Sequence, residues 1–494
     1  MTRSRKSVDS SIVFPGEISR QTLNARVKRK QLRLVAPGIY TTDLHASLET
    51  IVNQHWHVVV GHLFPGAVIT DRSAVTGSKV GGFLYVSHSR RARELVLPGL
   101  IVSARTGPGP LPGDIALPGG LHLASKARAL SENTQPSRTR GTRPPRTLNH
   151  DELANWIDQL CRHDGEALLL QYRSEAEELA GPLSTPPERL NALSQLISAA
   201  LGSRKSPTDN AALHARQTGK PFDQDRIRRL DLLASALRNA APQSQASAIT
   251  NTGGAFAIQA FYEAYFSNYI EGTIFTLPEA KALLYEDIVP VGRNADGHDV
   301  VGTYRLVADP TEMQRTATHA DEFLLILQSR HATLMSGRPL ANPGEFKTKP
   351  NQAGNTQFVD PALVAGTLIE GFSRLTNFDT AWERSVYISF LVSEIHPFTD
   401  GNGRMARIMM NAELVKGGQS KIVVPTGFRL DYLAALRRLS RHDDPTIYIK
   451  SMRFLHDYTQ QINWSSHETA LDDLTVTNAF EEASDSPILT LLRA

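Results

Sequence analysis

The stretch IHPFTDGNGRMAR, residues 395–407, places a histidine, an acid, a glycine-rich turn and two arginines within thirteen positions. Residues 381–395 space their apolar side chains so that most of them fall on one face of a helix. Pro397 ends that helix, because proline cannot continue the backbone hydrogen bonds of a helix interior. His396 is therefore predicted at the C-terminal edge of the helix. The following DGNG cannot continue a helix, and predicts a turn that takes positive φ and exposes its backbone amides.

A second helix is predicted from Arg404 onward, so that its N-terminus and the amides of the turn face one concavity. Such an arrangement binds phosphate. Arg404 and Arg407 are three residues apart and share a helix face, where two guanidinium groups can hold two phosphates. Asp400 supplies the hard oxygen ligand that Mg²⁺ prefers, and His396 is the group that can accept a proton near pH 7. The alternative is that His396 caps a helix and DGNG only connects two helices.

Residues 396–404, followed by Arg407, resemble the full signature of the Fic (filamentation induced by cAMP) family. The resemblance extends over about 250–460, and the segment 421–436 is similar to the helix pair that follows the signature in that family. It implies a helical core with one β-hairpin. It also implies a protein adenylyltransferase, in which a Ser, Thr or Tyr hydroxyl of a target protein attacks the α-phosphorus of ATP and releases pyrophosphate.

The resemblance implies a role for each residue of the motif. His396 would be the general base, Phe398 would anchor the loop in the core, and Asp400 would hold Mg²⁺ on the α- and β-phosphates. The remaining residues would hold the phosphates themselves: Gly401, Asn402 and Gly403 as a cradle, Arg404 on the β-phosphate and Arg407 on the γ-phosphate. Kinase-like relatives carry lysine at the position of Gly403. The glycine in this sequence therefore favours nucleotidyl over phosphoryl transfer. Other nucleotide donors remain open.

A second motif lies upstream in residues 261–275. Ser267 and Glu271 are spaced i, i+4 and share a helix face, and Gly272 could end that helix. From the spacing alone, an ordinary surface Ser and Glu is the preferred interpretation. The pattern S-x-x-x-E-G nevertheless resembles the inhibitory helix of Fic proteins that carry it ahead of the catalytic motif. The resemblance implies that Glu271 pairs with Arg407 and keeps ATP from seating productively.

Residues 344–361 have the place and pattern of the Fic flap, a hairpin that clamps the target segment by strand addition. Phe346 and Phe358 would sit on its strands. Lys347 stands where an arginine is usual, so this sequence departs from the family pattern and leaves the target open.

Bulk composition indicates a protein of two or three domains. The chain has 494 residues, of which 41% are hydrophobic and 21% charged, values typical of soluble globular proteins. The single cysteine, Cys161, excludes an internal disulfide and is interpreted as a packed thiol. The N-terminus lacks the apolar run of a signal peptide, and no apolar stretch approaches the length of a membrane span. A cytoplasmic protein is expected.

Charge is distributed unevenly along the chain. Residues 1–150 hold 21 Lys/Arg and 8 Asp/Glu, whereas the remainder holds 32 and 42. Such an excess at one end is expected of a domain that lies near polyanions. Residues 19–43 predict a helix and then a strand–turn–strand that closes at Pro37-Gly38, which is the ending of a winged helix. The helix region carries four cations: Arg26, Lys28, Arg29 and Lys30.

The segments PGAVITDRSAVTG (65–77) and GLHLASKARALSEN (120–133) resemble the N-terminal regions of AbiEi-type abortive-infection antitoxins, which are transcriptional regulators, and this looser resemblance covers about 15–200. That resemblance implies DNA as a partner and raises the hypothesis of a toxin–antitoxin fusion in one chain. The alternative is a basic domain that binds the adenylylation target or merely packs. Fic proteins often dimerise, so a homodimer is a further family expectation.

The expected fold is mainly α, with a Fic-type helical core and β-hairpin flap preceded by an α+β, winged-helix-like domain. The expected divisions are a basic domain (15–130), a Ser/Pro/Arg-rich linker (131–148), a helical connecting region (149–246), a catalytic domain (250–460) and a loosely held acidic tail (461–494). Two functions remain in competition. One is a Mg²⁺-dependent adenylyltransferase, and the other is a DNA-binding regulator that uses the Fic domain as a nucleotide sensor.

Overall fold

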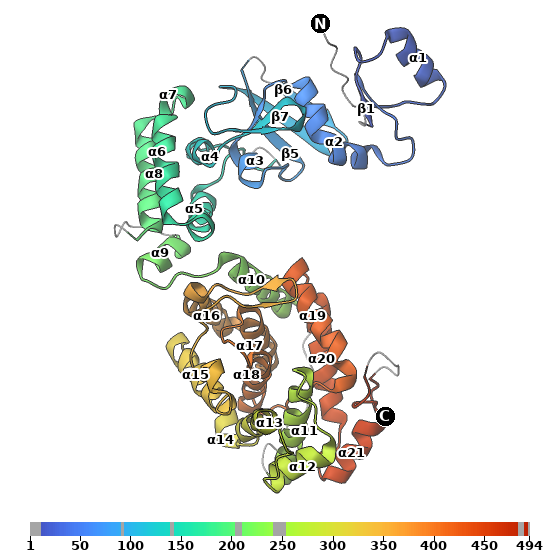
Figure 1. Ribbon diagram of the computed structural model, residues 1–494, viewed down its shortest axis with the longest axis vertical. Coiled ribbons are helices and arrows are strands. Elements are labelled where there is room, and N and C mark those ends of the chain that lie inside the picture. Colours follow the sequence, from blue (N-terminus) through green and yellow to red (C-terminus); the bar gives the residue numbers. More distant parts are fainter. Residues whose placement is uncertain are drawn as a thin grey trace. The chain divides into compact units, whose positions relative to one another are not determined.

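The computed structural model describes most of the chain (Figure 1). The described residues are 11–89, 93–138, 143–202, 210–240, 253–482 and 489–492. The chain divides into two compact units, Met1–Thr218 and Gly219–Ala494. Each unit has its own hydrophobic core.

The first unit begins with a small sheet and one cationic helix. Its elements are β1 (Ile12–Val13), α1 (Arg20–Lys28), β2 (Arg33–Ala36) and β3 (Ile39–Thr41). The strands are antiparallel in the order β1-β3-β2, and Gly38 takes a φ of 77° in the turn between β2 and β3. The expected helix followed by strand–turn–strand is therefore present. The helix ends at Lys28, so Arg29 and Lys30 lie just beyond it.

A six-stranded sheet forms the centre of the first unit. Its strands are β4 (Val68–Ile69), β5 (Phe83–His88), β6 (Arg93–Leu97), β7 (Leu100–Thr106), β8 (Ile115–Leu117) and β9 (Leu121–Leu123). Their order is β6-β7-β5-β4-β9-β8, and the β5–β7 and β4–β9 pairs are parallel. Helix α2 (Leu48–Leu63) buries Val59 and Val60 in the core of this sheet, and α3 (Asp71–Thr76) follows β4.

Helices complete the first unit. They are α4 (Lys126–Asn133), α5 (His150–Asp164), α6 (Glu166–Glu178), α7 (Ala180–Leu183), α8 (Pro187–Ala200) and α9 (Ala211–Gln217). Helix α4 lies between the sheet and α6 (Figure 1). Ile157 and Leu193 are fully buried where α5 and α8 pack together. Cys161 is buried in the same core, and burial raises the pKa of its thiol, as expected of a packed cysteine.

The expected linker at 131–148 is packed into the first unit over its described residues, 131–138 and 143–148. Helix α4 includes its first three residues, and Glu132 is buried between Arg105 and Arg128, at 2.8 and 3.1 Å. Thr147 is also buried. The segment has few apolar residues because its buried side chains are polar and form ion pairs. Sequence composition cannot distinguish such buried polar side chains from exposed ones. The chain divides instead after Thr218, so the expected connecting region is split between the two units.

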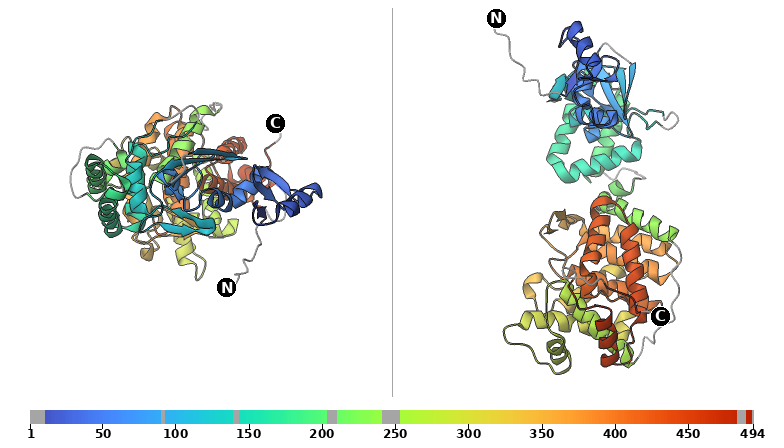
Figure 2. Two further views of the ribbon diagram at one scale, coloured as in Figure 1. Left: turned by 90° about the horizontal axis from the view of Figure 1, so that it is seen from above. Right: turned by 90° about the vertical axis from the view of Figure 1, so that its right-hand side faces the viewer.

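Over its described residues, the second unit is helical apart from one hairpin. Its helices are α10 (Gln224–Asn239), α11 (Gly254–Ile270), α12 (Leu277–Tyr285), α13 (Asn294–Val307), α14 (Pro310–Met313), α15 (Ala320–Leu334), α16 (Val364–Phe372), α17 (Ala381–Ile395), α18 (Asn402–Lys416), α19 (Arg429–His442), α20 (Thr446–Gln461) and α21 (His467–Val476). The hairpin is formed by β10 (Gln352–Ala353) and β11 (Thr356–Gln357). Helices α17 and α18 pack together in its interior, and α19 and α20 run side by side (Figure 2).

Buried polar contacts fix α11 to the centre of this unit. Glu263 of α11 accepts a hydrogen bond from Asn411 of α18 at 2.7 Å and pairs with Lys421 at 3.0 Å. All three side chains are buried, and burial lowers the pKa of Lys421 although Glu263 opposes that effect. Removing one partner of such a set leaves a buried polar group unsatisfied. The position of α11, which carries Ser267 and precedes Glu271, is thus tightly defined.

The expected loosely held tail is packed over its described residues. Trp464, Ala470, Leu474 and Leu489 are buried in the same core as α11 and α12. Apolar residues spaced along α21 supply that packing, whereas the acidic composition of the segment had suggested exposure. The expectation of a mainly α fold preceded by an α+β region is confirmed. Within the described residues, we find no helix that combines the length and hydrophobicity needed to span a bilayer.

Candidate active site

His396 forms the C-cap of α17 and takes the left-handed conformation, with φ 55° and ψ 60°. A non-glycine residue in this region is held there by its surroundings. Its Nδ1 lies 3.3 Å from the carbonyl oxygen of Ser393. Because a carbonyl can only accept, Nδ1 carries the proton, and Nε2 is left as the basic nitrogen. The prediction that His396 stands at the edge of the helix is confirmed.

The imidazole of His396 is covered by an aromatic ring. The ring of Phe358 stacks on it with centroids 3.7 Å apart and an interplanar angle of 4°. Burial, together with the nearby positive charge of Lys347, lowers the pKa of His396 to about 4. The histidine is therefore neutral at physiological pH, as a general base must be.

The loop after His396 is held by its own amide side chains. Asn402 Oδ1 accepts from the Phe398 N–H at 2.8 Å, and Asn402 Nδ2 donates to the Phe398 carbonyl at 2.9 Å. Asn351 Nδ2 donates to the same carbonyl at 2.9 Å. The side chain of Asn402 thus organises the loop, and only its backbone remains available to a phosphate. Helix α18 already begins at Asn402, because Gly401 with φ 77° ends the turn.

Phe398 is completely buried and stacks on His331, with ring centroids 3.6 Å apart. His331 Nδ1 accepts from the Gly344 N–H at 2.9 Å, so its Nε2 carries the proton and donates to the Asp400 carbonyl at 3.0 Å. Burial lowers the pKa of His331 to about 4. A neutral histidine therefore holds the loop from its buried side, and no motif around residue 331 marks this role.

Arg404 is buried behind the loop. Its Nη1 lies 2.9 Å from Asp299 Oδ2 and 3.3 Å from Asn268 Oδ1. Asp299 also accepts from Arg338 Nε at 2.8 and 2.9 Å. Arg404 Nε has no hydrogen-bond partner among the described residues. A buried donor without a partner is costly, so this guanidinium is suited to bind an anion.

Arg407 faces the end of α11. Its Nε donates to Ser267 Oγ at 2.9 Å, and its Nη2 donates to the Ser267 carbonyl at 2.9 Å and to Glu271 Oε1 at 2.6 Å. Burial alone would lower the pKa of Arg407, but the Glu271 carboxylate and Tyr432 together outweigh that effect and the pKa is raised. Glu271 is the C-cap of α11, and Gly272 follows with φ 90°.

Gly403 lies in direct contact with Glu271. A Cβ at position 403 would stand 2.2 Å from Glu271 Oε1 and 3.0 Å from its Cδ. Glu271 can therefore reach Arg407 only because residue 403 has no side chain. The same carboxylate occupies the space directly in front of the first turn of α18.

Asp400 points toward solvent, with its side chain 56% exposed. Its Oδ1 accepts from the Gly401 N–H at 2.7 Å, and its Oδ2 lies 4.0 Å from Arg404 Nη2, the limit of an ion pair. The described residues contain no group of three His, Cys, Asp or Glu side chains able to enclose a metal. Mg²⁺ often takes only one or two carboxylates and completes its shell with phosphates and water. A single exposed carboxylate beside the N-terminus of α18 fits that ion.

The flap differs in detail from the expectation. Its strands are two residues each, β10 and β11, so Phe346 and Phe358 flank the hairpin and do not lie on its strands. The ring centroids of Phe346 and Phe398 are 5.5 Å apart. The rings of Phe346 and Phe358 both pack instead against the loop that carries His396, Phe358 on His396 itself and Phe346 on Phe398.

Lys347 lies at the base of the flap. Its N–H donates to the Pro397 carbonyl at 2.9 Å, and its Nζ donates to Asn351 Oδ1 at 2.6 Å. Burial lowers the pKa of its ammonium to about 8. The flap is thereby joined to the loop that carries His396.

A pocket of about 380 Å³ gathers five of the predicted site residues, whereas the side chains of Asp400, Asn402, Phe346 and Lys347 and the backbone of Gly401 do not line it. It is lined by residues from both predicted motifs, the flap and α19, among them Glu271, Phe358, His396, Gly403, Arg407 and Tyr432. Ser267, Phe398 and Arg404 are buried and do not line this pocket. The structure thus brings together motifs that are over 120 residues apart in the sequence.

Several site residues were missed by the sequence prediction. Asp299, His331 and Glu394 position predicted residues or line the pocket, and Arg226 contacts both Glu394 and the flap. None of these four residues lies within a recognisable motif. Glu394 comes closest, two residues before the signature begins at His396. A buried acid at the end of an apolar helix was the only available signal.

Comparison with known proteins agrees with this geometry. The Fic/DOC family model matches residues 324–414, which include the whole loop from His396 to Arg407. The chain contains a Fic domain. Protein adenylyltransferase Fic of Drosophila sechellia is 26% identical over 270 residues, covering 52% of each chain. Protein adenylyltransferase fic-1 of Caenorhabditis briggsae is 24% identical over 212 residues, covering 39% of this chain and 42% of the relative.

The chain thus spans about half the length of the curated relatives it matches. Among solved structures, residues 134–508 of Fic-1 from C. elegans match with a TM-score of 0.35 and 16% identity, covering 67% of this chain and 90% of that one. A Fic domain protein from Bacteroides thetaiotaomicron matches with a TM-score of 0.37 and 17% identity, covering 50% and 97%.

Proposed function

We propose that this chain transfers AMP from ATP to a Ser, Thr or Tyr hydroxyl of a target protein, and that it restrains this activity itself. One observation carries the proposal. A neutral histidine with a free Nε2 lines the same pocket as Gly403 and Arg407. A base and a phosphate-binding helix N-terminus in one pocket are the groups that nucleotidyl transfer to a hydroxyl requires. The names of the related adenylyltransferases support the same reaction.

In the proposed reaction, His396 Nε2 accepts the proton of the target hydroxyl. The hydroxyl oxygen forms a bond to the α-phosphorus of ATP, and the bond from that phosphorus to the α–β bridging oxygen breaks. Pyrophosphate leaves and AMP remains on the target. Most of the catalysis is positioning and charge stabilisation, because phosphoryl centres need little covalent help from the protein.

The phosphates would lie across the first turn of α18. The amides of Asn402 and Gly403, in the first turn of α18, would donate to the phosphates, and the Gly401 N–H would join them if it left Asp400 Oδ1, to which it now donates. Arg404 would take the β-phosphate and Arg407 the γ-phosphate. Asp400 would hold Mg²⁺, which when bound neutralises phosphate charge. Other nucleoside triphosphates fit the same phosphate contacts.

The restraint would come from Glu271. While its carboxylate pairs with Arg407 and fills the space beside Gly403, Arg407 is not free to bind the γ-phosphate. ATP would then bind without its α-phosphorus in line with the hydroxyl. Ser267 supports this state, because it accepts a further hydrogen bond from Arg407.

The test uses ATP labelled on the α-phosphate with the purified wild-type chain, Glu271→Gly and His396→Ala. The expected result is strong self-labelling of Glu271→Gly, weak labelling of wild type and none of His396→Ala. Equal labelling of all three proteins would exclude His396 as the base. If no protein takes label, the assay is repeated with other α-labelled nucleotides. Labelling by one of them would show that ATP is the wrong donor, and its absence with all of them would contradict the proposed transferase activity.

We propose DNA binding by the first unit as a second function. The observation that favours it is the exposure of α1. Leu23 is the only buried residue of this helix, and Arg20, Arg26 and Lys28 are all exposed, as are Arg29 and Lys30 beyond its end. A helix with a single anchoring residue and no acid of its own suits contact with phosphates.

A gel shift with the DNA upstream of its own gene tests this function. Full-length wild type is compared with Arg26→Ala/Lys28→Ala over a series of salt concentrations, with and without ATP. The expected result is weaker binding by the variant and a shallower dependence on salt, because fewer counterions are released. Unchanged binding would exclude α1 as the contact. A change with ATP would favour the nucleotide-sensor alternative.

A further inference from the structure

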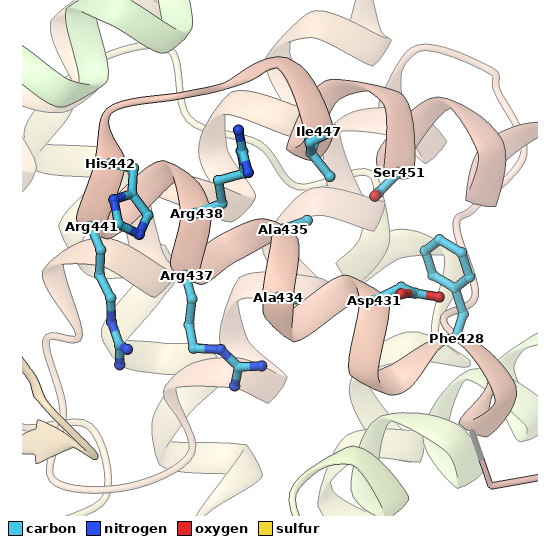
Figure 3. Close-up of a pocket in the computed structure, with 10 residues that line it drawn as sticks. All are labelled: Phe428, Asp431, Ala434, Ala435, Arg437, Arg438, Arg441, His442, Ile447 and Ser451. Carbon is cyan, nitrogen blue, oxygen red and sulfur yellow. The ribbon is translucent and has the colours of Figure 1, made fainter. Parts of the chain in front are cut away.

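The pocket that contains His396 continues outward along α19. Arg437 and Arg441 line this pocket and also a second, more open cavity of about 560 Å³ that involves α19 and α20 (Figure 3). The two arginines are spaced i, i+4 and therefore share a helix face. Figure 3 shows their guanidinium groups on the same side of α19, whereas Arg438 points to the other side. We call the side chains of Arg437 and Arg441 together the cationic mouth.

Neither charge of the cationic mouth is neutralised. Arg437 is exposed, and no residue in the described part of the chain forms a hydrogen bond or ion pair with it. Arg441 Nε donates to Thr356 Oγ1 of the flap at 2.9 Å. Within the described ranges, no carboxylate pairs with Arg441. Arg438, in contrast, pairs with Asp444 at 2.7 Å.

The acids of the catalytic pocket are engaged elsewhere. Glu271 pairs with Arg407, and Glu394 is held by Arg226 and Arg229 of α10. These carboxylates cannot turn to the cationic mouth without leaving buried arginines uncompensated. The mouth therefore presents two positive charges to whatever enters the pocket.

The negative charge that binds the cationic mouth could belong to the nucleotide or to the target protein. The location of the two arginines favours the target. The proposed phosphate site lies at Gly403 and Arg407, on the first turn of α18. The cationic mouth lies on α19, and its Arg441 is bonded to the flap, along which a target segment would enter. A planar guanidinium also matches a carboxylate through two parallel hydrogen bonds.

We propose that the cationic mouth recognises Asp or Glu residues that flank the modified hydroxyl in the target. This inference rests on the proposed function, and it specifies the substrate as a hydroxyl-bearing segment of acidic sequence. Two exposed charge pairs would change the KM for the target by about three- to tenfold. The contribution would fall with added salt, because these charges are exposed.

The experiment uses synthetic peptides with one central Ser, Thr or Tyr, flanked by Asp, Asn or Lys. The full-length Glu271→Gly chain transfers label from α-labelled ATP, and KM is measured for peptide and ATP separately. Asp-flanked peptides should have the lowest KM. Adding Arg437→Glu and Arg441→Glu should reverse the preference to Lys-flanked peptides, a result that structural damage cannot produce. Arg438→Glu is the matched control on the same helix and should keep the acidic preference.

Equal KM values for the three flanking sets would overturn the inference while leaving the transferase reaction intact. A change confined to the KM for ATP would also overturn it, because the arginines would then contact the nucleotide. If no label is transferred at all, the proposed function fails separately. Fluorescence anisotropy of the same peptides with the full-length His396→Ala chain then decides, since binding needs no turnover, and equal affinities would again count against the cationic mouth.

Discussion

Glu271 Oε1 and Arg407 Nη2 lie 2.6 Å apart, although the two residues are 136 positions apart in the sequence. The contact joins the end of α11 to the first turns of α18. Arg407 is 5% exposed and Glu271 35% exposed in this pair. The carboxylate can therefore leave toward solvent, whereas the arginine is fixed in place. This asymmetry is what a reversible restraint on an anion site would need.

Glu271→Gln should release part of the restraint. The amide keeps the shape of the side chain but loses its charge, and a charged hydrogen bond contributes about 1.5 kcal/mol, or about tenfold in the population of the released state. Self-labelling with α-labelled ATP is expected to rise by that order and to stay below that of Glu271→Gly. Ser267→Ala serves as the comparison, because it removes only a neutral acceptor and should give a smaller rise. A Glu271→Gln protein no more active than wild type would contradict the role of the charge.

Gly403→Ala should have opposite effects on stability in two backgrounds. In the wild type the new Cβ would meet Glu271 Oε1 at 2.2 Å, so the free energy of unfolding should fall by about 1–2 kcal/mol. In Glu271→Gly that obstacle is gone, and replacing a helical glycine by alanine should be neutral or stabilising by up to about 1 kcal/mol. Urea unfolding of the four proteins measures the coupling. Additive effects would show that Glu271 does not occupy this space in solution.

Phe358→Ala should raise the pKa of His396. The stacked ring contributes to the burial that lowers this pKa to about 4, so removing it should shift the value toward the ordinary histidine range. A higher pKa increases the protonated, inactive fraction below pH 6.5 and changes nothing at pH 8. Labelling by Glu271→Gly should accordingly decline at a higher pH when Phe358→Ala is added.

Histidine NMR titration provides the direct measurement for this prediction. Phe346→Ala is the matched control, because its ring contacts Phe398 and not His396. An unchanged His396 titration in Phe358→Ala would mean that the ring does not cover the imidazole in solution.

Arg226→Ala should loosen the flap. Arg226 donates to the carboxylate of Glu394 and to the Gln357 carbonyl of β11, so it ties α10 to both the catalytic pocket and the hairpin. Its loss should raise the KM for peptide targets by about tenfold with a smaller effect on kcat, and should speed hydrogen exchange in residues 352–357. Arg228→Ala is the control, because among the described residues Arg228 pairs only with Asp443, at 2.8 Å. Unaltered exchange in the hairpin would refute the tie.

The sequence was sufficient to predict those features that depend only on residues adjacent along the chain. The end of α17 at His396 and the hairpin at Pro37-Gly38 follow from proline and glycine chemistry, and both are present. Contacts made across the fold were not predictable. Asp299 reaches Arg404 from a helix about a hundred residues upstream, and nothing in its own neighbourhood marks it. The supposed linker at 131–148 failed for a related reason, because composition does not reveal that Glu132 is paired inside the fold.

His331 gives the last prediction, a dependence of stability on pH. Its Nδ1 accepts from Gly344 and its Nε2 donates to Asp400, so protonation would remove the first of these bonds. Because the folded-state pKa is lowered to about 4, the unfolded chain binds the proton first as pH falls below about 6.5. The free energy of unfolding should therefore be fully retained above pH 6.5 and decline between pH 6.5 and 4, by at most about 1.4 kcal/mol per pH unit for this group.

His331→Gln should make that decline shallower by about one proton, while lowering stability at pH 7 through the lost stacking on Phe398. Urea unfolding of the second unit at pH 7, 6, 5 and 4 measures both effects. His442→Gln is the control, since His442 is exposed at the end of α19 and its replacement should leave the slope unchanged. An identical slope in His331→Gln and wild type would mean that another group governs the acid sensitivity, and that the neutral histidine behind the catalytic loop is not required to stay neutral.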